Sequence, residues 1–315
     1  MPSPCATTRA SCTSSPWGRT DGPQPFPGAQ DYFVTLQQMS LWVTSLNSGS
    51  NGNCYYIGDG REAILVDAGL SCRETEKRMR RLGLRMDHVK AIFISHEHGD
   101  HIRGLETLSS RYRLPVYITS ETLRHSRLRL DGELVKTFRH RQPVPIGSFN
   151  IIPFIKHHDA AEPHSFLLES NNVRIGVFTD IGQVCDELRF FFGQCHAAFL
   201  ETNYDEHMLQ QGRYPWHLKN RIRGGKGHLS NAQALELFLG YRASYLSHLF
   251  LSHLSADNND PNLVLPLFRN QSGDTHIEVA PRHQELPLYA IHARASATCA
   301  VAAPEPVPTG QLRLF

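Results

Sequence analysis

The chain has no long apolar run and no paired cysteines. No stretch approaches the roughly 20 consecutive apolar residues of a transmembrane helix, and the N-terminus lacks the apolar block of about 7 to 15 residues found in signal peptides. We therefore expect a cytoplasmic protein that does not act at a membrane. The 7 cysteines are scattered without a CxxC pair, which argues against both a disulfide framework and a thiolate zinc site.

A strong excess of charge is also missing. The 32 basic and 30 acidic residues leave a formal net charge of +2, which says little about binding partners. Any basic surface must therefore come from a local segment. In contrast, the 40% of apolar residues in a chain of 315 is enough for a substantial hydrophobic core.

The composition divides the chain into a middle and two ends. Residues 1–38 are rich in Pro, Ser, Thr and Gly without a sustained period, so we expect a disordered N-terminal extension. In residues 39–282, apolar runs alternate with turn signals and helical patterns, which predicts an α/β domain. Residues 283–315 return to low-complexity sequence, and we expect a flexible C-terminal tail that ends in QLRLF.

Several apolar runs in the middle of the chain are followed by residues that commonly bind metals. The runs 91–95, 174–179, 197–200 and 249–252 precede His96, Asp180, Glu201 and His253, and a fifth run ends at His157 and His158. Buried strands that end this way indicate one site, assembled at a common sheet edge from distant segments. This constellation is stronger evidence than any single histidine in a chain that has 18 of them.

The segment HEHGDH, residues 96–101, adds a local spacing signal. It is not the helical HExxH site, because Asp100 stands four positions after His96. A turn can instead aim His96 and His98 at one cation, and Asp100 and His101 at a second. Two cations about 3.5 to 4 Å apart can hold a hydroxide between them, and ligands without thiolate suit Zn²⁺ or Mn²⁺, and also Fe²⁺. A histidine-rich surface turn is the alternative.

HEHGDH resembles the HxHxDH signature of the metallo-β-lactamase superfamily, and the later residues follow that family's order over residues 41–282. The resemblance implies a single domain with a four-layer αββα sandwich and two divalent metal ions. One ion would be held by His96, His98 and His158, the other by Asp100, His101 and His253, with Asp180 as a bridge. Asp67 would tie down the ligand loop. His157 remains an alternative to His158.

Further motifs resemble the YycJ and WalJ proteins, a branch linked to DNA exonuclease activity. These motifs are SLNSGSNGNCYYIG, HDAAEP, LETNYD, GHLSN and SADNN. The resemblance implies a dinuclear-metal phosphodiesterase that acts as a DNA exonuclease in repair or processing, with a metal-bridging hydroxide attacking the scissile phosphate. An antibiotic-cleaving enzyme is disfavoured, because such enzymes are secreted and usually differ at Asp100 or Asp180. The interval from Asp180 to His253 is also too short for an inserted domain of about 100 to 150 residues.

Residues 213–226 form a local basic segment that is interrupted by aromatic residues. The segment has no acidic residue, and it contains Arg213, Tyr214, Trp216, Lys219, Arg221, Arg223 and Lys226. Cations that bind phosphates, together with rings that stack on bases, are typical of a nucleic-acid-binding segment. We assign substrate binding to Arg221, Arg223, Lys226 and the nearby His228. A solvated basic loop is the alternative.

His228 stands beside a predicted helix start, because residues 230–233 have the spacing of a capping box. The free N–H groups of a helix N-terminus favour an anionic oxygen, so His228 could steady the scissile phosphate or protonate the leaving oxygen. Asp100 and His228 are the predicted catalytic residues. Glu201 and Asn203 could orient His228 or a metal ligand, or they could simply be a satisfied strand end.

The C-terminal peptide QLRLF resembles the motif by which bacterial replication and repair proteins dock on the sliding clamp. Leu314 and Phe315 could enter an apolar pocket while Gln311 makes polar contacts, and Leu312 completes the motif. The Pro-rich segment before it would give the peptide reach. A frayed terminus that happens to be apolar is the alternative.

Two rival functions remain open from the sequence. A small-molecule hydrolase that acts on a thioester or lactone would use the same metal ligands, and a pocket closed over the metals would favour it. A non-catalytic binding protein could keep the fold, but the full set of ligands argues against this interpretation.

Overall fold

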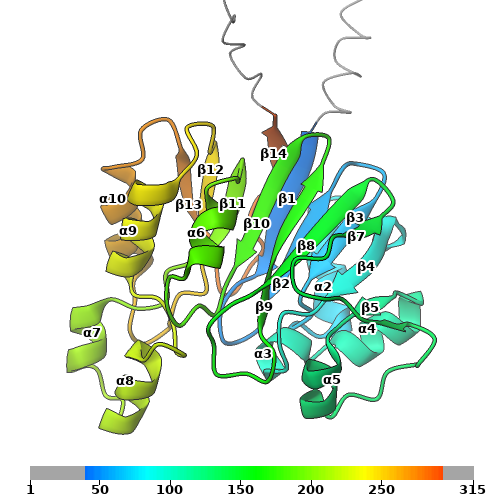
Figure 1. Cartoon of the computed structure of the whole chain (residues 1–315), viewed down its shortest axis with the longest axis horizontal. Helices are drawn as coiled ribbons and strands as arrows, with labels where there is room; N and C mark the ends of the chain where they lie inside the picture. Colours follow the sequence, from blue (N-terminus) through cyan, green and yellow to red (C-terminus); the bar gives the residue numbers. More distant parts are fainter. Residues whose placement is uncertain (1–39, 294–315) are drawn as a thin grey trace, which may run out of the picture. The chain divides into compact units, whose positions relative to one another are not determined.

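The computed structural model describes residues 40–293, so the predicted N-terminal extension and the clamp-binding peptide lie outside the described residues. The described part contains two 7-stranded sheets (Figure 1). The first sheet has the order β14-β1-β2-β3-β4-β5-β6, and the second has the order β13-β12-β11-β10-β9-β8-β7. Each sheet is therefore assembled from a continuous half of the chain, except that β14 returns to the first sheet.

The elements of the first half are β1 (Ser40–Asn47), β2 (Cys54–Gly58), β3 (Ala63–Val66), α2 (Cys72–Arg81), η1 (Met86–His88), β4 (Val89–Phe93), α3 (Gly99–Ile102), α4 (Leu105–Tyr112), β5 (Val116–Tyr117), α5 (Ser120–Ser126) and β6 (Val135–Lys136). Those of the second half are β7 (Val144–Ile146), β8 (Phe149–Ile155), β9 (His164–Ser170), β10 (Val173–Phe178), α6 (Asp186–Phe192), β11 (Ala197–Glu201), α7 (Glu206–Gln211), α8 (Trp216–Arg223), α9 (Asn231–Tyr241), β12 (His248–Ser252), α10 (Pro261–Arg269), β13 (His276–Val279) and β14 (Tyr289–His292).

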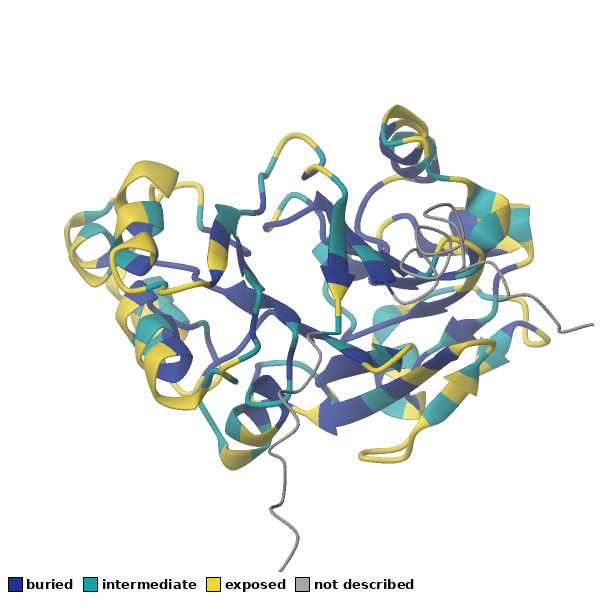
Figure 2. Ribbon diagram, turned by 90° about the horizontal axis from the view of Figure 1, so that it is seen from above, coloured by how far each residue is buried: buried dark blue, intermediate teal, exposed yellow. Residues whose placement is uncertain are grey.

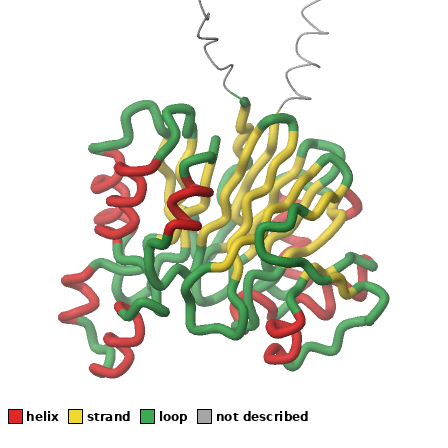
Figure 3. Tube along the Cα trace, in the orientation of Figure 1, coloured by secondary structure: helices red, strands yellow, loops and turns green. Residues whose placement is uncertain are grey.

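The core lies in layers between and outside the two sheets. Because side chains alternate along a strand, Leu41 and Val43 of β1 face inward and pack in one cluster with Phe166, Phe199 and Phe250 of the second sheet. A second cluster joins the outer face of the second sheet to α6, α9 and α10, and a third joins the first sheet to α2 and α4. Helices flank the strands on both sides, with their exposed faces outward (Figures 2 and 3). The predicted αββα sandwich is confirmed.

Strand direction places the functional loops at one edge. β3 and β4 are parallel in the first sheet, as are β10, β11 and β12 in the second. β8 and β10 both pair with β9 in the antiparallel sense, so these two strands also run in the same direction. In α/β folds, residues beyond the carboxyl ends of such strands form the ligand site.

The first sheet extends beyond the boundary that the sequence indicated. We expected a flexible tail from residue 283, but β14 pairs with β1 in the register Ser40–His292 to Val43–Tyr289. The low-complexity composition concealed this short strand, because its pairing partner lies at the opposite end of the domain. The sheet therefore reaches at least residue 292.

Helix α2 contributes one buried cation. Ser71 caps its first turn by accepting a hydrogen bond from the Glu74 amide at 3.3 Å, while the Glu74 side chain binds Arg78. Arg78 is buried and donates to the Leu46 carbonyl at 2.6 Å and to Asn47 Oδ1 at 2.7 Å. This side chain therefore anchors the end of β1 and is not part of a solvated basic face.

Within residues 40–293, no helix combines the length and the apolar character that are needed to cross a bilayer.

Candidate metal centre

Histidine and carboxylate side chains from distant segments converge where β4, β8, β10 and β12 end. The predicted metal ligands fall into groups whose ligand atoms lie within 4.8 Å of one another: His96, His98 and His158; Asp100, His101 and His253; and a linking group of His96, His101 and Asp180. The structure therefore brings together every residue that the sequence indicated as a ligand, with Asp180 placed between the two sets.

Three imidazoles form the first set. His98 Nδ1 lies 3.0 Å from His96 Nε2 and 3.3 Å from His158 Nε2. The other nitrogen of His158 donates to the Gly227 carbonyl at 3.0 Å, and the other nitrogen of His96 contacts Ser95 Oγ at 2.9 Å. Holding one ring nitrogen in a hydrogen bond orients the imidazole and leaves the other nitrogen for a metal.

The second set contains carboxylates as well as imidazoles. His101 Nδ1 donates to Asp67 Oδ2 at 2.7 Å, while His101 Nε2 lies 3.0 Å from Asp180 Oδ2 and 3.5 Å from Asp100 Oδ2. Asp100 Oδ2 is also 3.5 Å from His253 Nε2. Asp67 further accepts from the Ser95 amide at 2.8 Å, so it supports the HEHGDH loop as the resemblance implied.

The structure also distinguishes His157 from His158. His158 is buried in the cluster, whereas His157 is exposed and its carbonyl accepts from the Gly182 amide at 2.6 Å.

Backbone conformation at the strand ends is unusual. Asp67, Asp180 and His253 have φ values of 62°, 54° and 56°, in the left-handed region that residues other than glycine rarely adopt. Such conformations persist only where the surrounding contacts impose them, and they concentrate at functional sites. At these positions the sharp turn directs each side chain back across the strand ends.

A close approach of two loops requires glycine at one position. A Cβ atom on Gly69 would lie 1.7 Å from the Asp100 carbonyl oxygen. Next to it, the Asn53 amide donates to the same carbonyl at 2.7 Å, and Asn53 Nδ2 donates to Asp100 Oδ2 at 3.1 Å. The glycine-rich loop after β1 therefore holds the HEHGDH loop in place.

Glu201 joins two of the histidines. It is fully buried, and its Oε1 accepts from His228 Nδ1 at 2.7 Å and from His253 Nδ1 at 3.0 Å. Its Oε2 accepts from the amides of Ile181 at 2.6 Å and Leu229 at 3.3 Å. With both oxygens engaged, Glu201 is suited to orienting these two imidazoles rather than to binding a metal itself.

Asn203 supports the same region through the backbone. Its Nδ2 donates to the His253 carbonyl at 2.8 Å. The side chain of His228 is 19% exposed, so it is accessible from solvent, unlike Glu201 behind it. His228 also precedes helix α9, whose predicted capping box between Ser230 and Gln233 is present.

The buried histidines fall into two groups, one with a lowered pKa and one with a raised pKa. Burial lowers the pKa of His96 well below its usual value and that of His158 to about 4, so both imidazoles are neutral at pH 7. Burial also opposes the charge on His253, but Asp180, Asp100 and Glu201 raise its pKa to about 10. Similarly, burial opposes ionisation of Asp180, but His253 and His101 hold its pKa well below the usual range. A bound metal ion would add positive charge beside the carboxylates of Asp180, Asp100 and Glu201.

The donor set fits divalent metal ions. Asp180 Oδ2 and His253 Nε2 are buried and form no hydrogen bond of good geometry within the described residues, although His101 Nε2 lies 3.0 Å from the first and Asp100 Oδ2 3.5 Å from the second. A cation among these ligand atoms would offset the free-energy cost of burying them. Imidazole and carboxylate donors without thiolate are the ligands that Zn²⁺, Mn²⁺ and Fe²⁺ accept.

Sequence reasoning missed two contributors to this region. Lys156 is buried and its Nζ donates to the Thr179 carbonyl at 2.7 Å, beside the turn that carries Asp180. Burial lowers its pKa, and Asp180 opposes that effect. Asp159 was given no role either, although it belongs to the HDAAEP motif. For Lys156 the only sequence signal was its position two residues before His158.

The predicted substrate-binding residues lie on a helix and the loop after it, not on a loop alone. α8 accounts for residues 216–223, and Arg221 on this helix pairs with Asp159 at 2.6 Å. Asp159 in turn lies 3.4 Å from His158 Nε2, so Arg221 stands at the rim of the cluster. Arg223 and Lys226 are exposed.

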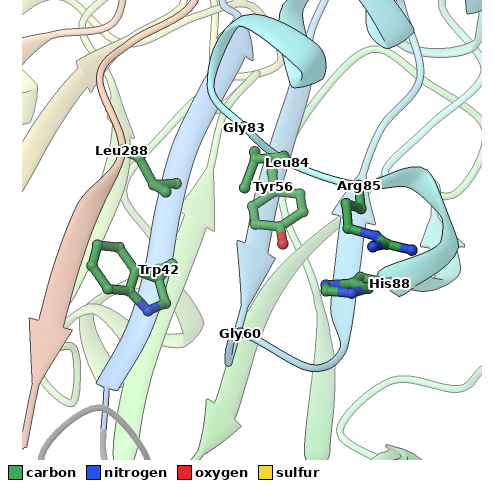
Figure 4. Close-up of a pocket in the computed structure, with 8 residues that line it drawn as sticks. All are labelled: Trp42, Tyr56, Gly60, Gly83, Leu84, Arg85, His88 and Leu288. Atoms are coloured by element: carbon green, nitrogen blue, oxygen red, sulfur yellow. The ribbon is translucent and has the colours of Figure 1, made fainter.

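A separate pocket of about 200 Å³ lies on the outer face of the first sheet (Figure 4). Trp42 of β1 and Tyr56 of β2 line it, together with Leu288, Leu84 and His88. It contains no member of the histidine and carboxylate cluster, so it is not a pocket closed over the metals.

Comparisons with known proteins agree with this geometry. Residues 62–253 match the Beta-lactamase superfamily domain. The chain is 36% identical over 229 residues to "Exodeoxyribonuclease YycJ" of Bacillus anthracis, covering 72% of this chain and 87% of that protein. It is 29% identical over 249 residues to "Exodeoxyribonuclease WalJ" of Streptococcus pneumoniae, covering 78% and 93%.

A solved structure shows the same fold at low sequence identity. Zn²⁺-bound PqqB from Methylobacterium extorquens has a TM-score of 0.61 and 16% identity, with coverage of 78% of this chain and 99% of that chain. The chain therefore belongs to the metallo-β-lactamase superfamily, in the branch that includes YycJ and WalJ, and is a metal-dependent hydrolase.

Proposed function

We propose that this protein is a dinuclear-metal DNA exonuclease that acts in the cytoplasm in DNA repair or processing. The observation that carries the proposal is the arrangement of two ligand sets around Asp180, beside the solvent-accessible His228 and the buried Glu201 that holds it. The printed names of two relatives, both exodeoxyribonucleases, support a DNA substrate.

The predicted ligands would hold two divalent ions, Zn²⁺ or Mn²⁺ and alternatively Fe²⁺. His96, His98 and His158 would bind one ion, Asp100, His101 and His253 the other, and Asp180 both. When bound, such a pair supplies Lewis acidity that acidifies water and neutralises charge on a phosphate. The buried atoms of Asp180 and His253 that form no hydrogen bond of good geometry support this assignment.

His228 would act on the oxygen that leaves phosphorus. Because Glu201 accepts the Nδ1–H of His228 at 2.7 Å, the Nε2 atom is the nitrogen left to exchange a proton with the substrate.

An end-labelled DNA digestion tests the proposal. The metal-loaded protein should release nucleotides progressively from a labelled 30-mer in Zn²⁺ or Mn²⁺, and Asp100→Ala or His98→Ala should abolish release. Asp186→Ala is a matched control, because this carboxylate is 98% exposed at the start of α6. If the metal-loaded protein leaves DNA and RNA intact but opens a lactone or cleaves a thioester, the small-molecule alternative replaces the nuclease.

We also propose that the C-terminal QLRLF peptide docks on a bacterial sliding clamp. Gln311, Leu312, Leu314 and Phe315 lie outside the described residues, so the support is the sequence motif alone. Deleting residues 311–315 should remove binding to the clamp in a surface-immobilised assay and leave DNA digestion without the clamp unchanged. Equal clamp binding by the truncated and full chains would rule out this role.

A further inference from the structure

Helix α8 carries cations on two sides. Arg221 turns toward Asp159 and the metal centre. Lys219 and Arg223 instead line a pocket of about 320 Å³ that also has Tyr204, Gln210 and Gln233 in its wall. Figure 1 shows α7 and α8 at the same end of the fold as α3, which carries Asp100 and His101. The pocket therefore lies at the same end of the fold as the metal centre and contains none of its residues.

The two cations of this pocket have no carboxylate partner. Within residues 40–293, neither Lys219 nor Arg223 forms an ion pair, and Lys219 Nζ donates instead to the Gln210 carbonyl at 2.7 Å. Glu206, the acid in the wall, accepts from Ser230 Oγ at 3.2 Å. The pocket wall therefore carries two cations, one carboxylate and two side-chain amides, an excess of positive charge that suits an anion with several acceptor oxygens, and a nucleic-acid phosphate has this chemistry.

An exposed aromatic ring stands next to the same pocket. The side chain of Trp216 is 69% exposed, and the guanidinium of Arg223 lies 4.7 Å from the centre of its ring. Positions 216 and 223 are two turns apart, so both residues are on one face of α8. A large ring left in solvent beside a phosphate-binding cation is a platform on which an unpaired base can stack.

A short loop, residues 224–228, connects this face of α8 to the metal centre, where the scissile phosphate would lie. The His228 amide donates to the Ile222 carbonyl at 2.8 Å, and the Gly227 carbonyl accepts from His158 Nδ1 at 3.0 Å. The loop from α8 to His228 is thereby fixed to both the helix and the first set of imidazoles. A strand whose scissile phosphate lies at the metals could therefore continue along α8.

We propose that the pocket beneath α8 is a second phosphate site for a single-stranded nucleic acid, with a neighbouring base stacked on Trp216. This inference rests on the proposed nuclease function and adds a strand preference to it. A base within a duplex is already stacked and paired, so only a single strand can use the ring. Lys219 and Arg223 bind the phosphate, and Trp216 selects for the unpaired base.

Binding of the metal-loaded protein to oligothymidylate with phosphorothioate linkages, which resist cleavage, tests the inference by fluorescence anisotropy. Trp216→Ala should weaken single-strand binding about tenfold or more, and Trp216→Phe should retain most of it. Binding to a blunt duplex of the same length should change less than about twofold, since stacking on the ring is unavailable. Lys219→Ala should reduce the slope of log Kd against log salt by about 0.7.

Matched controls separate a specific site from general surface effects. Phe190 on α6 is 56% exposed and also has an arginine, Arg141, 5.4 Å from its ring, so Phe190→Ala removes the same chemistry elsewhere. Lys90→Ala removes an exposed cation from β4. Both control variants should bind single strands as the wild type does.

Several outcomes decide the inference independently of the nuclease proposal. Equal losses on single strands and duplexes for Trp216→Ala, or an unchanged salt slope for Lys219→Ala, would overturn it even if DNA is digested normally. If these variants behave as expected but the wild type cleaves no nucleic acid, the phosphate site is supported and the proposed nuclease function is refuted. Single-stranded RNA that binds with the same dependence also supports the pocket, because the phosphate and base are common to both polymers.

Discussion

Asp180 illustrates how much the site depends on individual residues. Its backbone has a φ of 54°, its Oδ1 lies 3.5 Å from His253 Nδ1, and its Oδ2 lies 3.0 Å from His101 Nε2. A strained backbone and a buried carboxylate are both costly unless the surroundings compensate for them. Their coincidence at the residue between the two ligand sets is the strongest local indication of a bound cation.

The role of His228 can be tested at the same scale. His228→Ala should lower the rate of DNA hydrolysis by about 10²- to 10⁴-fold, the usual contribution of a general acid, while the metal content stays that of the wild type. With a p-nitrophenyl phosphodiester the loss should be much smaller, because that leaving group needs no proton. Rates on both substrates, with metal content measured by mass spectrometry, provide the test.

Two results would contradict this role. An equal loss of rate on both substrates would indicate that His228 binds the phosphate without protonating the leaving group. A loss of metal in the variant would instead make His228 a ligand, as its proximity to Asp180 and His253 allows.

At the scale of elements, the site depends on loops that pack closely against each other at the strand ends. The loop after β3 touches the start of α3, where a Cβ atom on Gly69 would meet the Asp100 carbonyl at 1.7 Å. The same backbone region accepts the Asn53 amide from the loop after β1. Separating these loops would therefore move Asp100 and His101 relative to the other ligands.

Gly69→Ala should destabilise the protein by about 1 to 3 kcal/mol, because the clash involves backbone on both sides and cannot be relieved by a rotamer change. It should also lower metal affinity. Gly132→Ala is the matched control, since a Cβ atom there has no neighbour within 4 Å. Denaturant unfolding of both variants gives the free energies, and similar values for the two would refute the packing argument.

At the scale of the whole molecule, the ligands come from both halves of the sandwich. His96, Asp100 and His101 follow strands of the first sheet, whereas His158 and Asp180 follow strands of the second. A metal bound between them would link the two sheets. Because such a ligand binds the native state and not the unfolded chain, it stabilises the fold by mass action.

Removal of metal should therefore lower the melting temperature. A free metal concentration of 100 times Kd corresponds to about 2.7 kcal/mol of stabilisation, which is several degrees for a domain of this size. Scanning fluorimetry with EDTA, followed by re-addition of Zn²⁺ or Mn²⁺, measures the shift. Asp180→Ala should respond less to EDTA than the wild type, and an identical Tm with and without EDTA would exclude a stabilising metal.

The sequence alone was sufficient for the fold family and for the types of residue at the site. HEHGDH is a local motif. An apolar run followed by a ligand-type residue indicates the end of a strand, because both features are found in consecutive residues of the chain. The four-layer sandwich was implied by the resemblance of HEHGDH and the later motifs to the metallo-β-lactamase superfamily, and both the sandwich and the superfamily are confirmed.

Only the tertiary structure decided which side chains meet. It placed His158 rather than His157 in the cluster, paired Glu201 with both His228 and His253, and added β14 to the first sheet. It also showed that residues 216–223 of the predicted basic segment form a helix whose cations face in different directions. These contacts join segments far apart in the chain, so their geometry follows from how the two sheets and their helices pack, which no local pattern specifies.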